Sequence, residues 1–280
     1  MVALFVTTSQ GKHTNLPPFG HIPTYSSLFK PYGGFMRRCL HCFTHFFVQN
    51  DQSKQLLNGL GFTNVTVGGD TRFDRVAEIV TRDNHLDFVE QFKGDALCVV
   101  FGSSWPADEE VYLQYLNSCK GRVKFIIAPH NIHPDEIAVL KHNKQKLDRK
   151  VALFSEKDTL NLADYEVLII DTIGILTKVY SYADIAYVGG GMGNTGLHNV
   201  LEPAVFGIPV LIGKNYSRFN EAKELVALGG VLSISTPEQF ATAMDSLINS
   251  ADKRAAIGAI NSRYITEKQG ATQAFLSVCQ

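Results

Sequence analysis

The sequence lacks an excess of charge of either sign. Its 26 lysines and arginines are balanced by 27 aspartates and glutamates, which gives a formal net charge of −1 at pH 7. Proteins that bind nucleic acids usually carry a basic patch that contacts the phosphates, and the basic clusters of this chain are short. We therefore expect no nucleic-acid partner.

Cysteine is scarce, and the five cysteines present show no paired pattern. Cys39 and Cys42 form a Cys-x-x-Cys motif, but no second pair completes a zinc set and no thioredoxin-like context surrounds the motif. Because disulfides persist mainly in oxidising compartments, this usage predicts a reduced, cytosolic protein.

Long apolar runs are missing as well. The apolar stretch at residues 2–6 leads directly into polar residues, whereas a membrane-spanning helix needs about 20 apolar residues. The same stretch lacks the charged start and the cleavage site of a signal peptide. We expect no transmembrane segment in this chain, so any contact with a membrane is peripheral or is made by a part of the protein outside it.

What the sequence does contain is a regular succession of short apolar runs. Hydrophobic residues make up 45% of its 280 positions, which is enough to bury a sizeable core. After a loop-like start of about 35 residues, the runs predict strands at 43–49, 64–69, 96–104, 123–129, 151–154, 165–171, 184–190, 208–213 and 230–234. The segments between them predict helices at 51–61, 106–119, from near 133, at 174–183, 198–207, 218–229 and, in two or three pieces, at 237–278.

The pattern of these runs predicts the fold class. The runs do not alternate between apolar and polar residues, so both faces of each strand are expected to be buried, and helices separate consecutive strands. This arrangement is typical of an α/β protein with a doubly wound parallel sheet. Ligands of such sheets bind beyond the carboxyl ends of the strands, so the candidate ligand-binding loops are residues 102–110, 128–136, 171–176 and 189–203.

The loop at residues 189–196, GGGMGNTG, is the richest in glycine. Glycines let the backbone approach a ligand closely, and the unpaired N–H groups at the start of a helix bind anions. The loop has neither the Gly-Lys-Ser/Thr of a P-loop nor the place of a dinucleotide fingerprint at the first strand of a sheet. A phosphate site is the prediction, and a simple tight turn is the alternative.

Polar groups also follow the other predicted strands. Ser103 and Ser104 offer hydroxyls to a phosphate. The alternative is that Ser104 or Trp105 forms the entry to the next helix. His130 and His133 come just after Pro129. The alternative there is that Pro129 ends the strand and His133 caps a helix, and no convincing third ligand supports a metal site.

Two groups of charged residues complete the candidates. Glu202 lies one turn into the helix predicted after the glycine loop, where its carboxylate can accept hydrogen bonds from a ribose diol. The alternative is a surface acid favoured by the helix dipole. Arg72 and Arg75 flank Asp74, and a local salt bridge is the simplest interpretation.

Taken in order, these segments resemble a known family, the 3-deoxy-D-manno-octulosonate (Kdo) transferases, over about residues 40–280. The resemblance is carried by GDTRFDRV, GSSWPADEE, IIAPHNIHPDEI, DTIGIL, YSYADIAYVGGG, GLHNVLEPAVFGIPVLIG and FNEAKEL. It implies a GT-B glycosyltransferase that attaches Kdo from CMP-Kdo to lipid A precursor in lipopolysaccharide biosynthesis. The combination of GDTRFDRV with GSSW is similar to that of Bacteroidetes-type members.

The resemblance implies roles for individual residues. Those that would contact CMP, with Glu202 on the ribose, are Pro129, His130, Ile173, Gly174, Ile175, Asn199, Val200, Leu201 and Glu202. Those that would lie near the phosphate and the sugar are Ser103, Ser104, Gly190, Gly191, Gly196 and His198. Family members often have arginine at the position of His130 and glutamate at that of Ile175. No metal ion is implied, and no cofactor beyond the donor substrate CMP-Kdo.

The resemblance also implies that the chain is shortened at its start. Complete members begin with a membrane-anchoring segment and an acceptor-binding domain that carries a glutamate general base. Residues 1–67 are expected to be a remnant of that domain, partly loop. Residues 68–280 are expected to form the donor domain, with its last helices packing back on the remnant. The implied partners are CMP-Kdo, lipid A precursor and the cytoplasmic face of the inner membrane, and the general base is expected to be absent.

In the implied reaction, an acceptor hydroxyl attacks the anomeric carbon of Kdo with inversion, and CMP leaves. The glycine loop and the helix after Gly196 would stabilise the charge that grows on the phosphate. Without the general base, we expect weak or no transfer by this chain alone. Two other functions stay open. One is a different GT-B enzyme, a UDP-sugar epimerase or transferase, which would prefer a uridine nucleotide. The other is a non-catalytic remnant that binds a nucleotide or a partner.

Overall fold

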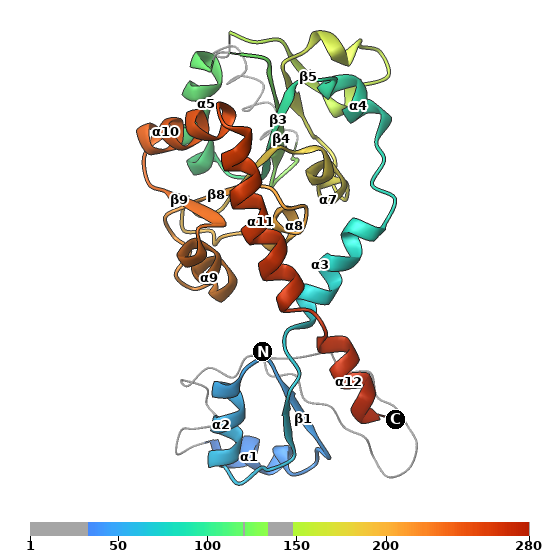
Figure 1. Cartoon of the computed structure of the whole chain (residues 1–280), viewed down its shortest axis with the longest axis vertical. Coiled ribbons are helices and arrows are strands. Elements are labelled where there is room, and N and C mark those ends of the chain that lie inside the picture. The colour runs from blue at the N-terminus through green and yellow to red at the C-terminus, as the bar shows by residue number, and fades with distance from the viewer. Residues whose placement is uncertain (1–32, 120, 134–147, 280) are drawn as a thin grey trace. The chain divides into compact units, whose positions relative to one another are not determined.

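The computed structural model describes residues 33–119, 121–133 and 148–279 (Figure 1). The chain divides into two compact units, one made of Met1–Ala77 and Thr266–Gln280 and the other of Glu78–Ile265. The boundary falls within helix α3 (Thr71–Thr81) and again within helix α11 (Ala251–Glu267). That residues 1–67 are the remnant of an acceptor-binding domain stays a prediction. The loop-like start and the helix predicted from near residue 133 lie outside the described residues.

The first unit is built on two short parallel strands, β1 (Phe46–Val48) and β2 (Val65–Val67). Successive strand residues point to opposite faces. On one face Phe46 and Val48 join a buried cluster with residues of α1 (Gly34–Leu40) and α2 (Asp51–Gly59). On the other face Phe47 packs against Phe275 of α12 (Ala271–Cys279), with 5.1 Å between the ring centroids. Both faces of this small sheet are therefore covered.

Asp74 joins α3 to the start of α12. Its carboxylate accepts hydrogen bonds from the amides of Gly270 and Thr272, both at 2.6 Å, and from the Thr272 hydroxyl at 2.7 Å. Burial raises the pKa of Asp74, but these hydrogen bonds outweigh burial and lower the pKa below its ordinary value. Arg72 pairs with Asp70 at 2.8 Å. The predicted local salt bridge thus exists with Asp70 as its acid, whereas Asp74 holds the start of α12.

The second unit contains a seven-stranded sheet in the order β5-β6-β4-β3-β7-β8-β9. Every strand pairing in it is parallel. This confirms the predicted α/β class with a doubly wound parallel sheet. The strands are β3 (Leu97–Ser104), β4 (Val123–Pro129), β5 (Val151–Leu153), β6 (Val167–Ile169), β7 (Ile185–Val188), β8 (Val210–Gly213) and β9 (Val231–Ile234).

Helices cover both faces of this sheet. On one face, Phe101 of β3 and Tyr187 of β7 pack with Tyr112 of α5 (Pro106–Ser118) and with α10 (Pro237–Ile248). Figure 1 shows α5 and α10 side by side, and their residues share one buried cluster. On the opposite face, Tyr180, which follows α7 (Leu176–Val179), packs over Gly102 so closely that a Cβ at Gly102 would overlap its hydroxyl. The buried runs that predicted the strands are thus explained by packing on two sides.

Several helices differ from the sequence-based expectation. α1, α3 and α4 (Asp87–Lys93) were not predicted. The residue that caps α2 is Asn50, whose Oδ1 accepts from the Ser53 amide at 2.9 Å. The helix expected at 198–207 is reduced to α8 (Leu201–Ala204), whereas α9 (Asn220–Leu228) agrees with the prediction.

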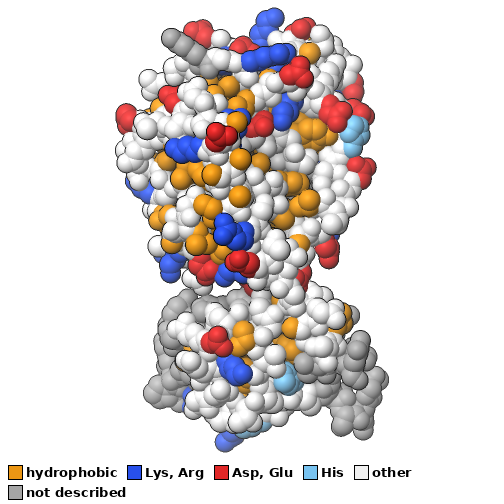
Figure 2. Space-filling view, viewed as in Figure 1, with side chains coloured by type: hydrophobic (Ala, Val, Ile, Leu, Met, Phe, Trp, Pro, Cys, Tyr) orange, Lys and Arg blue, Asp and Glu red, His pale blue; other side chains and the backbone are white. Residues whose placement is uncertain are grey.

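Figure 2 shows acidic and basic side chains interspersed over one face of the molecule, with hydrophobic side chains between them. This mixture is consistent with the small net charge of the sequence. Within the described residues, no helix combines the length and the apolar character needed to cross a bilayer.

Candidate functional site

The chain reverses its direction of travel through the sheet between β3 and β7. These two strands are neighbours, but the chain continues from β3 to β4 on one side and from β7 to β8 on the other. The loops that follow β3 and β7 therefore diverge, and ligands of doubly wound sheets bind in the crevice that such a divergence leaves. The loop after β3 carries Trp105, and the loop after β7 carries the glycines.

Three aromatic rings meet at this point. Trp105 stacks on His130, which follows β4, with 4.3 Å between ring centroids and 19° between planes. The Trp105 Nε1–H donates to His198 Nε2 at 3.0 Å, and the two histidine rings lie 4.4 Å apart. Trp105, His130 and His198, here called the ring cluster, thus bring together the loops after β3, β4 and β7.

The ring cluster fixes the state of His198. The indole N–H can only donate, so Nε2 of His198 is the acceptor and a neutral ring carries its proton on Nδ1. Burial, and the neighbouring His130, lower the pKa of His198. The imidazole is therefore neutral near pH 7, with Nδ1–H as its free donor.

A buried carboxylate holds the glycine loop in place. Asp108 lies in the first turn of α5 and is fully buried. Its Oδ2 accepts from the amides of Gly190 (2.8 Å) and Trp105 (3.1 Å). Its Oδ1 accepts from the Tyr187 hydroxyl (2.8 Å) and the Met192 amide (3.3 Å). Because the Gly190 amide is committed to Asp108, a phosphate would have to find its donors elsewhere in the loop.

The loop glycines are required by close packing. Gly190 has φ +87°, and a Cβ there would overlap the Gly196 carbonyl. A Cβ on Gly189 would overlap the backbone of Ser103, which itself has φ +52°. Glycine is the residue that adopts positive φ without strain and leaves room for another backbone. The loop is therefore tightly folded whether or not it also binds an anion.

The two predicted serines differ in their surroundings. The Ser104 hydroxyl is buried and lies 2.7 Å from the Tyr112 hydroxyl, so it faces the core. The Ser104 carbonyl accepts from the His130 amide at 2.9 Å. Ser103 is half-buried at the end of the strand. Of the two serines, only Ser103 is not enclosed in the core.

Glu202 links the loops after β6 and β7. Its carboxylate accepts from Asn199 Nδ2 at 3.0 Å and, more weakly, from the Thr177 hydroxyl at 3.4 Å. Asn199 also accepts from the Leu201 amide at 3.1 Å, which starts α8. Burial, together with the charge of Glu202, raises the pKa of Tyr180 well above its ordinary value. The carboxylate is thus held by two donors while it stays half-buried rather than enclosed.

The other predicted nucleotide contacts lie at the same edge of the sheet. Pro129 ends β4 opposite Ser104. Ile173 is 76% exposed, and Gly174 beside it has φ +90°. Val200 and Leu201, by contrast, are buried, so only their backbone can face a ligand.

The short helix α8 changes the electrostatic argument. It begins at Leu201, five positions after Gly196, and contains four residues. The sequence had predicted a helix that starts directly behind the glycine loop and presents its positive end to a phosphate. A macrodipole grows from aligned peptides and acts within its first turn, so four residues at this distance provide little of it. The helix-dipole part of the prediction is therefore wrong.

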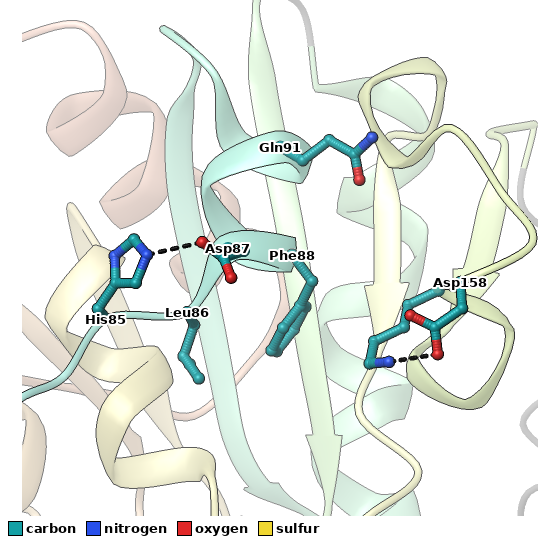
Figure 3. A pocket seen from close by; sticks show the side chains of 7 residues that line it. His85, Leu86, Asp87, Phe88, Gln91 and Asp158 are labelled. Carbon is teal, nitrogen blue, oxygen red and sulfur yellow. Dashed lines mark hydrogen bonds and ion pairs between the residues drawn. The ribbon is translucent and has the colours of Figure 1, made fainter.

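A cavity of about 500 Å³ lies elsewhere, beside α4 (Figure 3). The charged side chains around it pair with one another. His85 is 2.7 Å from Asp87, and Lys157 is 2.6 Å from Asp158. None of the predicted site residues lines this cavity. Within the described residues, no group of three or more histidines, cysteines, aspartates or glutamates is placed to hold a metal ion.

No known protein-family profile matches the sequence. Curated proteins named 3-deoxy-D-manno-octulosonic acid transferase do match it. The protein of Rickettsia bellii is 26% identical over 225 residues, which cover 79% of this chain and 53% of that protein. That of Chlamydophila psittaci is 28% identical over 189 residues, 66% of this chain and 43% of that protein. A stretch of 115 residues is 36% identical to the protein of Haemophilus influenzae. The chain is thus similar to Kdo transferases over most of its length. It spans about half the length of the first two relatives.

Solved structures share the fold of this chain. The C-terminal CMP-Kdo binding domain of WaaA from Acinetobacter baumannii superposes with a TM-score of 0.55 at 20% identity, and covers 70% of this chain and 97% of that domain. A glycosyltransferase from Rickettsia africae gives a TM-score of 0.55 at 13% identity, and covers 93% of this chain and 66% of its own. At such identities the likeness concerns the fold, and it confirms the GT-B-type α/β class.

Sequence reasoning missed several residues of this site. Trp105 was considered only as a helix entry, yet it lies at the centre of the ring cluster. Asp108 was not singled out, yet it holds the glycine loop. Thr177 was not singled out. The tryptophan directly after a strand end was the one signal in the sequence that could have pointed to the ring cluster.

Proposed function

We propose that this chain carries the donor site of a Kdo transferase and binds CMP-Kdo at the switch point of its seven-stranded sheet. One observation carries the proposal. The ring cluster, the glycine loop held by Asp108, and Glu202 converge at the carboxyl-terminal edge of the sheet. Four loops contribute to it, as expected for a site that must recognise a base, a ribose and a phosphate together. The names of the relatives supply the identity of the donor.

The cytosine would lie against Pro129 and His130. The His130 amide already donates to the Ser104 carbonyl, so the imidazole and the backbone beyond it are the groups left for the base. Because His130 is stacked on Trp105, its ring is fixed before the nucleotide binds. A fixed ring reduces the entropy that binding would otherwise cost. The segment Ile173–Ile175, in which Ile173 and Gly174 are exposed, would cover the nucleotide from the loop after β6.

Glu202 would accept hydrogen bonds from the ribose hydroxyls. Each carboxylate oxygen has two lone pairs, so the bonds from Asn199 and Thr177 leave further acceptor sites. Those two donors also fix the orientation of the carboxylate. Substitution of Glu202 should therefore lower the affinity for every ribonucleotide, whereas discrimination between cytosine and uracil should depend on the loop after β4.

The phosphate would lie between the ring cluster and the glycine loop. The Nδ1–H of neutral His198, the Ser103 hydroxyl and loop amides other than that of Gly190 are the available donors. In the transfer step, an acceptor hydroxyl oxygen forms a bond to the anomeric carbon of Kdo as the bond from that carbon to the phosphate oxygen breaks. CMP leaves with the electron pair. Each preorganised donor to the leaving group contributes about 3 kcal/mol in comparable sites.

The acceptor side of the reaction is a proposal based on the family alone. The acceptor would be lipid A precursor, at the cytoplasmic face of the inner membrane, in lipopolysaccharide biosynthesis, with inversion at the anomeric carbon. The hydroxyl proton would pass to a general base that the resemblance assigns to the acceptor-binding domain. A general base typically contributes roughly 10²–10⁴-fold, so we expect weak or no transfer by this chain alone. Robust Kdo transfer by the isolated 280-residue chain would contradict this part.

The proposal is tested by titration of the chain with CMP, UMP and UDP in a calorimeter. We expect CMP to bind more tightly than either uridine nucleotide, and Glu202→Gln to weaken CMP binding. A preference for UMP or UDP would instead indicate another GT-B nucleotide-sugar enzyme. A third outcome would indicate a non-catalytic nucleotide-binding protein. In that case CMP binds, CMP-Kdo binds no more tightly than CMP, and no Kdo is transferred even when acceptor and the acceptor-binding domain of a complete relative are added.

A further inference from the structure

A second cavity, of about 570 Å³, opens on the glycine loop itself. One wall is made by residues 193–196 of the loop, and the other by residues that follow β8, up to Phe219 at the start of α9. None of the residues predicted to contact CMP lines it, and from the predicted phosphate and sugar group only Gly196 does. The cavity therefore adjoins the proposed phosphate position without overlapping the nucleotide contacts.

The charge of this cavity is one-sided. Lys214 and Arg218 line it, and no acidic residue does. Both side chains belong to exposed residues, and no ion pair joins either of them to another residue in the described part of the chain. Some basic residues of this unit are paired instead, for example Lys93 with Asp184 at 3.0 Å and Arg149 with Glu166 at 2.7 Å. Two unneutralised cations in a concave site favour an anionic ligand.

The walls of the cavity are held in position. The backbone N–H of Asn215 donates to the Gly191 carbonyl at 2.8 Å, and its side-chain Nδ2 donates to the Gly193 carbonyl at 2.9 Å. Gly191 and Gly213 pack so closely that a Cβ on Gly213 would overlap the Gly191 backbone. The cations are thus mounted on a segment bonded directly to the glycine loop. A site whose geometry is fixed before binding loses less entropy when it binds.

The position and charge of the cavity identify the part of the donor that it can take. A nucleotide bound at the ring cluster and Glu202 would direct its sugar past the glycine loop, because the phosphate joins the two. In the relatives the transferred sugar is, by their name, an octulosonic acid, so it carries a carboxylate. Guanidinium and ammonium groups bind carboxylates through short charge-assisted hydrogen bonds. We propose that Lys214 and Arg218 bind the carboxylate of the transferred acidic sugar. This inference rests on the proposed CMP-Kdo donor site.

The test compares CMP with intact CMP-Kdo in the full chain. Calorimetric affinities are measured for wild type, Lys214→Ala, Arg218→Ala and Lys223→Ala, with the intact donor quantified by phosphorus NMR. Lys223 is the matched control, because it is an exposed lysine of α9 that does not line the cavity. Loss of one charge-assisted contact corresponds to a roughly ten- to hundredfold loss of affinity. We expect that loss for CMP-Kdo with both cavity variants, with less than about a twofold change for CMP.

The remaining outcomes separate the claims. Equal losses for CMP and CMP-Kdo, or no loss for either, would overturn the carboxylate assignment while leaving the nucleotide site intact. A wild-type chain that binds neither ligand would overturn both. Inorganic phosphate provides a further arm. If the cavity variants lose phosphate binding but keep wild-type affinity for CMP-Kdo, the cavity serves a phosphate and the inference is wrong. Circular dichroism of each variant excludes unfolding as the cause of a loss.

Discussion

Removal of the Asp108 carboxylate should loosen the glycine loop and destabilise the larger unit. Two of its four donors, the Gly190 amide and the Tyr187 hydroxyl, belong to buried residues. A buried donor left without an acceptor costs about 1–3 kcal/mol, so Asp108→Ala should lower the free energy of unfolding by about 2–6 kcal/mol. Asp108→Asn keeps one acceptor oxygen, and the Tyr187 hydroxyl can turn to accept from the new amide. The free energy of unfolding should therefore fall about half as much in Asp108→Asn as in Asp108→Ala.

The single tryptophan of the chain provides the assay. Trp105 donates its backbone amide to Asp108, so its fluorescence follows the unfolding of this unit in urea, and linear extrapolation gives the free energy. Glu110→Ala is the matched control, because Glu110 is an exposed acid on the same helix and its loss should change stability by less than about 0.5 kcal/mol. An Asp108→Ala variant as stable as Glu110→Ala would refute the assigned role.

Three further predictions follow from the geometry. Glu202→Gln should weaken CMP binding by roughly tenfold, because a charge-assisted hydrogen bond to the ribose becomes a neutral one, and a calorimetric affinity within twofold of wild type would contradict this. Since burial lowers the pKa of His198, the unfolded state binds more protons, so the stability followed by Trp105 should fall as the pH drops below about 6.5. His198→Gln should flatten that dependence, and a profile that falls as steeply in the variant would assign the titration to another group. Gly189→Ala should destabilise the unit, since a Cβ would overlap the Ser103 backbone, whereas Gly193→Ala, whose Cβ would meet Ala107 at an ordinary 3.5 Å, should be tolerated; equal thermal stability of these two variants would contradict the packing argument.

The strands were predictable because their apolar runs are buried on both faces by helices from distant parts of the sequence. A short run rich in β-branched and aromatic residues, such as Val123–Ile127, is typical of a strand buried on both faces. The helices were less predictable. Phe73, Val76 and Ile79 of α3 have the spacing of an amphipathic helix. This segment was used only for the resemblance carried by GDTRFDRV, and its helical spacing was overlooked.

The helix after the glycine loop is shorter than the sequence pattern predicted. A helix that began at His198 would place Pro203 in its interior, where the proline ring clashes with the carbonyl four positions earlier. The structure avoids this by starting α8 at Leu201, whose amide is bound by Asn199 Oδ1. Gly207, with φ +67°, then ends the turn. Both signals are present in the sequence.

The core of the site could not be derived from local sequence. Strand-end loops and the glycine motif indicated the correct edge of the sheet, and Glu202 and His130 do lie there. The partners of Asp108 come from the loop after β3 and from β7 and the loop that follows it, about 80 positions apart, and their meeting depends on the order of strands in the sheet. The same holds for Trp105 and His198. Such long-range contacts become visible only once the strand order is known.

The most direct test of the central claim uses the side-chain resonance of Trp105. The chain has one tryptophan, so its indole Nε1–H gives a single NMR signal, and that N–H donates to His198 inside the ring cluster. If CMP binds at the switch point between β3 and β7, this signal should shift in a saturable way with CMP, and the shift should weaken in Glu202→Gln at equal CMP concentration. If CMP binds calorimetrically but leaves the indole signal unchanged, the nucleotide site is not at the ring cluster and the account is wrong.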